Sequence, residues 1–335
     1  MTRLYARTAG AAALAILSLT VLHASAQTEV PAAPAQTPAT PSAPAPASPT
    51  PEALVFPKPN PEFFTATTPT IDTINAFLEA SWGYEENRIW QVEAVLKTAV
   101  DGVSKVIVYI GDKSGKEKPT VLQFFAMPDG KHIITGNDIV AFGDKPYADF
   151  RARLQQEATG PARGAVSKDL ELVEFADFQC PHCKEAQANM DKLVADFPKA
   201  RIVFQNDPIA SLHPQANKAA AYGVCVAKMG GSTAFFNFAA DVFNGQDGLA
   251  TPDGATMTLN SALAKASLDP GKVAACADSA ETKAQVDASV KLASDLGIGQ
   301  VPTLVINGRE VPANVPYDTL KKIVAYQAKL DGVTM

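Results

Sequence analysis

The segment Leu-Val-Glu-Phe-Ala-Asp-Phe-Gln-Cys-Pro-His-Cys, residues 172–183, decides how the rest of the chain folds. An apolar run with β-branched and aromatic side chains ends at Phe178, which is typical of a strand. Two cysteines, Cys180 and Cys183, then stand at the head of a stretch with helical periodicity. The segment therefore predicts a strand that delivers a pair of thiols to the N-terminus of a helix.

The placement of this pair favours an acidic thiol. The first turn of a helix has unpaired N–H groups and the positive end of the helix dipole, and both stabilise a thiolate. Pro181 fits the first turn because it needs no hydrogen-bond acceptor there, and His182 adds a cation when protonated. We expect Cys180 to be an exposed nucleophile and Cys183, one turn further along, to be a buried resolving thiol.

Half of a zinc site is the alternative reading of two cysteines at this spacing. A closed zinc site needs four ligands, usually in two tight pairs. Cys225 and Cys276 stand far apart in the sequence, and neither His132 nor His213 is paired with them. The spacing therefore argues against a metal, and we expect none.

Residues 1–26 have the pattern of a cleavable secretory signal. Arg3 and Arg7 precede an apolar run from Thr8 to Leu22, and the small residues 24–26 form a cleavage site. The run is short for a membrane span, and we expect a mature protein outside the cytoplasm, periplasmic or secreted, where disulfides persist.

Composition sets the remaining limits. The net charge of −6 and the lack of a basic cluster exclude a nucleic-acid partner. A length of 335 residues with 47% hydrophobic residues predicts about two domains with ordinary cores. Residues 27–61 are rich in proline and alanine and predict a disordered spacer; a tether or a ligand for a partner is the other reading.

Residues 62–145 predict a small α+β domain, in which one helix precedes antiparallel strands. Ile71 to Leu78 have the spacing of one helix face, and turn signals divide the run that follows. No pairing of a nucleophile with a base, no metal cluster and no phosphate loop occurs here, so this domain has no predicted chemistry. The expected strands are 90–96, 103–110, 121–126 and 131–135. Residues 146–165 predict a linking helix and a hinge at Gly160 to Gly164.

Residues 166–335 predict a second, α/β domain built around the dithiol. The helix that begins at the cysteines stops at Pro198, and a strand at 201–205 follows it. Residues 208–297 read as several helices, and Asn307-Gly308 marks a two-residue hairpin before a last helix. Strand, helix, strand, helical insertion, hairpin and helix is the plan of a thioredoxin-like domain with a helical insertion.

Three separated motifs in this domain resemble the DsbA-type thiol-disulfide oxidoreductases. They are Glu174-Phe175, the Cys-Pro-His-Cys segment 180–183 and Val301-Pro302-Thr303, and the resemblance covers residues 166–330. It implies disulfide exchange with protein clients and no cofactor, and the Pro-His dipeptide marks strongly oxidising members of that family.

The resemblance also implies roles for single residues. Pro302 would be a cis-proline facing the dithiol, with Val301 offering its backbone to a client; an ordinary trans proline is the alternative. Glu174, six residues before Cys180, would be a buried acid that exchanges a proton with Cys183; a solvent-facing strand residue is the alternative.

Cys225 and Cys276, 51 residues apart, are expected to form a structural disulfide in an oxidising compartment, as in many DsbA-like proteins. A second redox-active pair remains the alternative. His213, which precedes Pro214, is expected to have a structural or capping role only.

The first domain resembles the N-terminal dimerisation domain of the DsbC and DsbG isomerases, through the segment 129–136 and the helical linker. The site departs from those isomerases at His182 and Val301. The chain therefore combines an isomerase-like N-terminal domain with an oxidase-like site. We prefer a disulfide donor as the function, with a dimeric isomerase or reductase as the alternative.

The partners expected from this resemblance are unfolded or misoxidised secreted proteins, a membrane redox partner and, through the first domain, a second copy of the chain. A quinone-linked oxidase would serve a disulfide donor, and a membrane reductant would serve an isomerase. A chaperone-like binder whose dithiol is incidental, and a dedicated reductase or thiol peroxidase-like enzyme, are the remaining hypotheses.

Overall fold

The computed structural model describes residues 54–334, and within them it contains two five-stranded sheets. The expected secretory signal and most of the expected spacer lie outside the described residues. Residues 61–141 form the first sheet with its helix, here called the N-terminal module. Residues 148–330 form the second sheet with its helices, here called the dithiol domain.

The N-terminal module is an antiparallel meander with one helix packed on it. A short 3₁₀ helix, Pro61–Phe63, precedes α1, Ile71–Trp82, whose N-cap Thr70 accepts the backbone N–H of Thr73. Ile74 and Leu78 of α1 are fully buried against the sheet. The strands are β1 (Arg88–Lys97), β2 (Ser104–Asp112), β3 (Thr120–Ala126), β4 (His132–Thr135) and β5 (Asp138–Ala141), in that order across the sheet. The fifth strand was not expected from the sequence. It follows the turn at Gly136 and has only four residues, which is too short a run to show an alternating pattern.

The sheet of the dithiol domain has the strand order β10-β9-β7-β8-β6. Its central strand β7 pairs parallel with β8 on one side and antiparallel with β9 on the other. Asn307 and Gly308, both with positive φ, make the predicted hairpin turn between β9 and β10. The strands are β6 (Ala162–Gly164), β7 (Leu170–Ala176), β8 (Ala200–Asn206), β9 (Thr303–Ile306) and β10 (Arg309–Pro312).

Side chains of β7 alternate between two helical layers. Leu170 and Leu172 face α3 (Pro181–Asp196) and α8 (Tyr317–Leu330) on one side of the sheet. Val173 and Phe175 face α2 (Ala148–Glu157) and α7 (Ala280–Asp295) on the other side. By the same alternation Glu174 belongs to the layer of α3, the helix that carries the dithiol. A five-stranded sheet between two helical layers confirms the predicted thioredoxin-like α/β arrangement.

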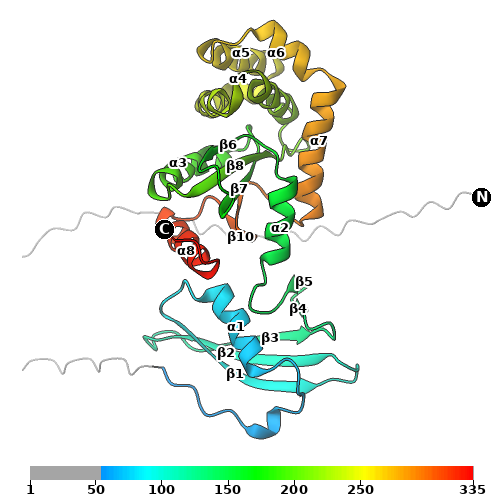
Figure 1. Ribbon diagram of the computed structural model, residues 1–335, viewed down its shortest axis with the longest axis vertical. Helices are drawn as coiled ribbons and strands as arrows, with labels where there is room; N and C mark the ends of the chain where they lie inside the picture. The colour runs from blue at the N-terminus through cyan, green and yellow to red at the C-terminus, as the bar shows by residue number, and fades with distance from the viewer. Residues whose placement is uncertain (1–53, 335) are drawn as a thin grey trace, which may run out of the picture. The chain divides into compact units, whose positions relative to one another are not determined.

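The helical insertion consists of α4 (Ala216–Asn244), the 3₁₀ helix Gln246–Ala250, α5 (Pro252–Lys265), α6 (Pro270–Ala277) and α7. Figure 1 shows α4, α5 and α6 grouped together, with α7 returning along the sheet beside α2. Gly231 has φ +75°, so α4 is two helices joined by a kink, as the Gly230-Gly231 pair predicts.

Phe178 anchors the insertion to the sheet. It is 1% exposed and lies two residues after the end of β7 and two residues before Cys180. Its ring centroid lies 5.2 Å from that of Phe204 in β8 and 5.2 Å from that of Phe243 in α4. Packing of Phe178 against the core of the insertion therefore holds in place the turn that carries the dithiol.

The hinge expected at Gly160 to Gly164 is part of the dithiol domain instead. Ala162–Gly164 is β6, which pairs antiparallel with β8, and a Cβ at Gly160 would lie 1.9 Å from the carbonyl oxygen of Phe204. Leu154 of the expected linking helix is buried against the same sheet. Glycine serves here for close packing rather than for flexibility.

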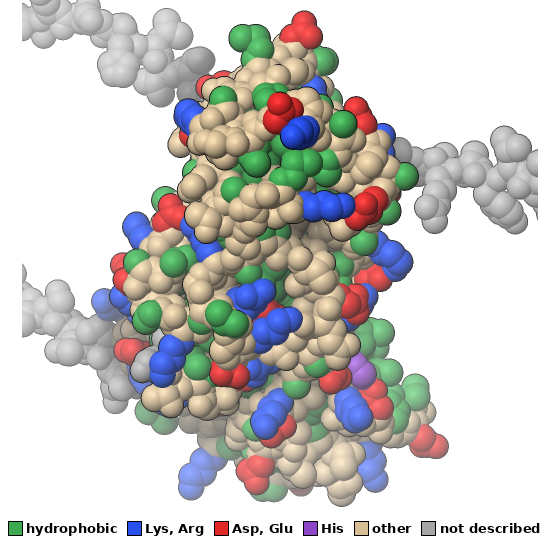
Figure 2. Space-filling model, turned by 45° about the horizontal axis from the view of Figure 1, so that its top comes forward, with side chains coloured by type: hydrophobic (Ala, Val, Ile, Leu, Met, Phe, Trp, Pro, Cys, Tyr) green, Lys and Arg blue, Asp and Glu red, His purple; other side chains and the backbone are tan. Residues whose placement is uncertain are grey.

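Charges of both signs are interspersed on the face of the molecule shown in Figure 2. Among residues 54–334, no helix combines the length and the apolar character needed to cross a membrane.

The insertion contains a disulfide between Cys225 in α4 and Cys276 in α6, with Cα atoms 6.0 Å apart. Its closed loop of 51 residues predicts a loss of about 4 kcal/mol of unfolding free energy in a Cys225→Ala/Cys276→Ala variant. Denaturant unfolding measures this loss. A structural disulfide leaves the glutathione equilibrium of the Cys180–Cys183 pair unchanged, whereas a change in that equilibrium would indicate that the two pairs exchange electrons.

Candidate functional site

Cys180 and Cys183 lie where β7 gives way to α3. Cys180 is the N-cap of α3 and has extended backbone angles, and Pro181 occupies the first helical position. The Cys180 carbonyl accepts the backbone N–H groups of Cys183 and Lys184 at 3.1 and 3.2 Å. Both thiols are free, so the structure shows the dithiol form of the pair.

The two thiols have opposite acidities. The pKa of Cys180 is lowered to about 6, first by a hydrogen bond from the Cys183 thiol and then by the backbone N–H groups of Cys183 and His182. Burial raises the pKa of Cys183 far above its usual value, and the hydrogen bond it donates to Cys180 adds to this effect. One stable thiolate is therefore paired with one thiol that holds its proton.

The expectation that Cys180 is an exposed thiol is wrong. Cys180 is 5% exposed and Cys183 is fully buried. The Cys180 Sγ lies 3.8 Å from the carbonyl oxygen of Val301, which covers it from the side of β9. Little of the Cys180 side chain is therefore open to solvent.

His182 lies on the outside of α3. Its Nδ1 is 3.0 Å from a carboxylate oxygen of Glu185, and this contact raises the pKa of His182. The Cys180 thiolate also raises the pKa of His182. The attraction is mutual, so a charged His182 favours the Cys180 thiolate.

Glu174 lies beneath the dithiol with 1% exposure. Burial raises its pKa to about 7, and the hydrogen bond from the Gln187 side chain at 2.7 Å opposes that rise only in part. Its charge also raises the pKa of Cys183, which places the two groups within electrostatic reach. Glu174 is thus a buried acid rather than a solvent-facing strand residue.

The Val301–Pro302 peptide bond is cis, and the adjacent Val301 carbonyl contacts the Cys180 Sγ. The structure thus brings together the cysteines, Glu174, Val301 and Pro302 from β7, α3 and the segment before β9.

Asp177 and His213 belong to this site as well, and the sequence reading gave them no role in it. The Asp177 backbone N–H points to the Cys183 Sγ at 3.4 Å, and its carboxylate lies 2.8 Å from Nδ1 of His213. An acid placed between a strand and a Cys-x-x-Cys motif, and a histidine before a helix, are the only sequence signals for this pair.

Two glutamines from outside the motif also hold the turn in place. Gln246 is buried and donates to the carbonyls of Phe178 and Cys180, both at 2.9 Å. Gln179 donates to the Leu249 carbonyl and accepts the N–H of Gln215. These contacts tie the turn to the helical insertion, and nothing in the local sequence indicates them.

Cys225 and Cys276 are joined to each other in the core of the insertion, away from the dithiol. They are therefore not ligands of a zinc ion with Cys180 and Cys183. No cluster of three or more potential metal ligands occurs in the part of the chain that the structure describes.

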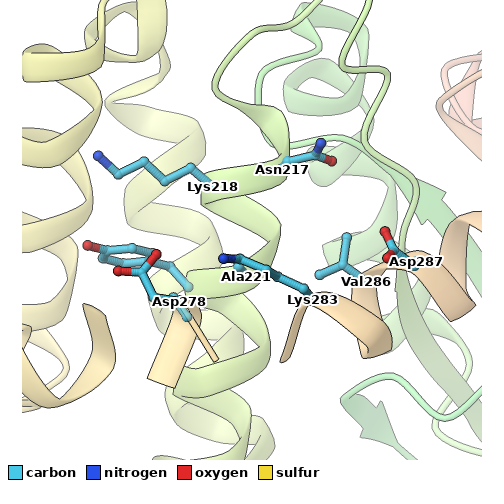
Figure 3. Close-up of a pocket in the computed structure, with 9 residues that line it drawn as sticks. Asn217, Lys218, Ala221, Asp278, Lys283, Val286 and Asp287 are labelled. Atoms are coloured by element: carbon cyan, nitrogen blue, oxygen red, sulfur yellow. The ribbon is translucent and has the colours of Figure 1, made fainter. Parts of the chain in front are cut away.

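Two of the hollows on the dithiol domain differ in their position relative to the sulfurs. One, of about 640 Å³, is in the insertion between α4 and the ends of α6 and α7; Figure 3 shows Lys218 on one wall and Asp278, Lys283 and Asp287 on others. No residue of the dithiol site lines it. The other, of about 700 Å³, begins at Pro181 and runs between α3 and α4, past Lys184, Phe236 and Gln246. Of these two, only the second is lined by a residue of the Cys-Pro-His-Cys motif, Pro181.

Comparison with curated proteins finds short matches within larger proteins. A Na⁺/H⁺ antiporter NhaA 3 of Salinispora tropica is 34% identical over 68 residues, which are 20% of this chain and 10% of that protein. A Na⁺/H⁺ antiporter NhaA 1 of Mycolicibacterium vanbaalenii is 28% identical over 167 residues, 50% of this chain and 26% of that protein. The chain thus spans about a quarter or less of the length of these relatives.

Solved structures that match part of the chain include the thiol-disulfide exchange protein alpha-DsbA2 of Wolbachia pipientis, with a TM-score of 0.47 and 20% identity over 56% of this chain and 96% of that one. A periplasmic thioredoxin-like protein of Salmonella enterica matches with a TM-score of 0.45 and 21% identity, over 54% of this chain and 96% of that one.

The family match is to a thioredoxin model and covers residues 156–325. It begins after the N-terminal module, so the resemblance of residues 62–145 to a dimerisation domain stays a prediction. The match spans half of the chain and contains the whole dithiol site, and the protein therefore belongs to the thioredoxin family.

Proposed function

We propose that the protein is an extracytoplasmic thiol-disulfide oxidoreductase that donates disulfides to secreted protein clients through Cys180 and Cys183. The observation that carries this proposal is the split in acidity between the two thiols. A cysteine whose pKa is lowered to about 6 is a good leaving group, which makes its own disulfide oxidising. Its neighbour stays protonated and buried, and so does not compete for the client.

In the oxidised enzyme, a client thiolate attacks the Cys180 sulfur and breaks the Cys180–Cys183 bond. The client and Cys180 are then joined in a mixed disulfide, and the Cys183 thiolate takes up a proton. A second client thiolate attacks the client sulfur of this mixed disulfide, which releases a client disulfide and the Cys180 thiolate. Two client thiols are oxidised and the enzyme disulfide is reduced.

Glu174 serves the proton transfers at Cys183. With its pKa raised to about 7, the carboxyl group is near its midpoint at neutral pH. It can give a proton to Cys183 when Cys183 leaves, and accept one when Cys183 attacks a mixed disulfide. Because both groups are buried, the proton passes between Glu174 and Cys183 rather than to and from bulk water.

The surroundings of the sulfurs suit an extended protein segment. Beside the Cys180 sulfur lies the backbone of Val301 and Pro302, and on the other side the hollow along α3 includes the aromatic side chains Phe236 and Phe243. Unfolded secreted clients supply such segments. Because each turnover leaves a reduced dithiol, a membrane-bound oxidase is the expected partner for its reoxidation.

A dimeric isomerase or reductase is the second candidate, and the N-terminal module favours it. This module exposes large apolar side chains on its strands: Val121 is 53% exposed, Phe125 40% and Ile139 68%. Ile139 lies in β5, at the edge of the sheet, where a second copy of the module could add. A dimer mass in light scattering supports this candidate, and a monomer mass removes it.

The first prediction from the proposed function concerns the redox equilibrium. We expect a reduction potential well above that of the glutathione pool and a Cys180 thiolate that titrates near pH 6, because the thiolate is stabilised by several hydrogen bonds. Equilibration in glutathione buffers and the ultraviolet absorbance of the thiolate measure the two quantities. A thioredoxin-like potential with a near-neutral thiolate pKa contradicts the donor assignment and favours the reductase or isomerase.

The second prediction concerns the mixed disulfide. Cys183→Ala removes both the resolving thiol and the hydrogen bond that contributes most to the low pKa of Cys180. We expect the variant to accumulate covalent client complexes, with a Cys180 thiolate that titrates above pH 6. Cys180→Ala is the matched control and should trap nothing. Equal trapping by both variants would mean that Cys180 is not the attacked sulfur.

The third prediction concerns Glu174→Gln, which keeps an oxygen for the Gln187 hydrogen bond but does not titrate. We expect resolution of the mixed disulfide to slow by roughly 100-fold, because the proton acceptor is lost. Stopped-flow kinetics with a model peptide measure this step, and an unchanged rate would exclude Glu174 from it.

The same variant should be more stable than the wild type at high pH. The folded-state pKa of Glu174 lies above its ordinary value of 4.5, so the ionised carboxylate destabilises the fold increasingly as pH rises from 4.5 to about 7. Above that range we expect the stability advantage of Glu174→Gln over the wild type to be larger than at low pH by on the order of 3 kcal/mol of unfolding free energy. Denaturant unfolding on both sides of the range tests this.

A further inference from the structure

Asp177 contacts both halves of the dithiol turn through its backbone. Its carbonyl accepts the N–H of Cys180 at 3.1 Å, and its own N–H points to the Cys183 Sγ at 3.4 Å. Because these are main-chain contacts, they need no particular side chain at position 177. The buried carboxylate, with the residue only 1% exposed, therefore calls for a separate explanation.

The Asp177 carboxylate joins the dithiol turn to the loop 207–215 between β8 and α4. One oxygen accepts the N–H of Gln179 at 2.7 Å. The other accepts the N–H of Ile209 at 2.8 Å and lies 2.8 Å from Nδ1 of His213. A carboxylate can only accept, so Nδ1 carries the hydrogen and the imidazole is held in a fixed orientation.

We propose that His213, fixed by the buried Asp177 carboxylate beside the dithiol turn, is a second histidine of the dithiol site, and that its protonated form stabilises the Cys180 thiolate. The exposed His182 occupies the surface of α3 and is paired with Glu185. His213 is anchored instead by a side chain that is fully buried, with 18% of its own side chain exposed. It is thus a positioning residue with a defined geometry rather than only a cap of α4.

The charged groups around this pair are consistent with such a role. A charge on His213 lowers the pKa of Cys180, alongside the stronger effects of the hydrogen bonds within the motif. Asp207, at the start of the same loop, has its pKa raised to about 6 by burial and by the nearby Asp177 charge. Asp177 and His213 thus contact each other next to the dithiol turn, and Asp207 lies near enough to Asp177 to respond to its charge.

The consequence for exchange is a better leaving group. Each turnover ends when the Cys180 thiolate leaves the client sulfur, and a cation beside it lowers the barrier of that step. This consequence rests on the proposed exchange reaction. The thiolate titration does not, because it is measured on the reduced protein without a client, so failure of either claim can be told from failure of the other.

The test compares a neutral and a charged substitution of His213. His213→Gln keeps an N–H donor for Asp177 and removes the charge, whereas His213→Lys keeps both a donor and a charge. We expect His213→Gln to raise the Cys180 thiolate midpoint by roughly half a unit to one unit, and His213→Lys to stay within a few tenths of a unit of the wild type. The glutathione equilibrium should shift in step, by about three- to tenfold toward a less oxidising pair in His213→Gln.

The matched control is His132→Gln. His132 also lies against an aspartate, with its Nδ1 2.6 Å from Asp129, but in the N-terminal module. It should leave the thiolate midpoint unchanged. Equal midpoints in the wild type, His213→Gln and His213→Lys would overturn the proposal, and so would equal shifts in the two variants, since these would mean that only packing matters. If His213→Gln does not fold, His213→Asn provides the neutral arm.

Discussion

The hydrogen bond from the Cys183 thiol to the Cys180 sulfur is the interaction on which the site depends. It is the largest cause of the low pKa of Cys180, and it contributes to the high pKa of Cys183. It requires one sulfur at the N-cap of α3 and the other one turn inside, fully buried. The strand, the proline at the first helical position and the apolar core beneath Phe178 all serve this geometry. Burial alone would have raised the pKa of both thiols.

Burial of Glu174 shows how the fold supports chemistry at a cost in stability. An ionised carboxylate buried between the sheet and α3 is unfavourable, and one hydrogen bond from Gln187 offsets only part of that cost. A leucine at this position would continue the pattern of Leu170 and Leu172, which face the same helices. The acid is thus explained by proton transfer at Cys183, not by packing. Its pKa reaches about 7 because helices cover both faces of the sheet and keep water away from the carboxyl group.

The sequence was sufficient for most of the fold, because the main signals are local. The apolar run before Cys180, the Asn307-Gly308 turn and the prolines that open α5 and α6 each act within a few residues. The errors arose where packing decides. Gly160 and Gly164 read as a hinge, but both lie against the backbone of β8. Cys180 was expected to be exposed, but the Val301 carbonyl, 121 residues away, covers its sulfur.

The same distinction applies within the site. The motif names the sulfurs, but the side chains that hold their turn come from three other places: Gln246 from the insertion, His213 from the loop after β8, and Asp177 from the end of β7. None has a local signature, since glutamine, histidine and aspartate are ordinary residues in loops. All of these contacts involve residues 177–180, and they connect this turn to the insertion and to the loop before it. The insertion therefore acts as a frame for the dithiol turn, which a minimal thioredoxin plan without it would have to hold by other means.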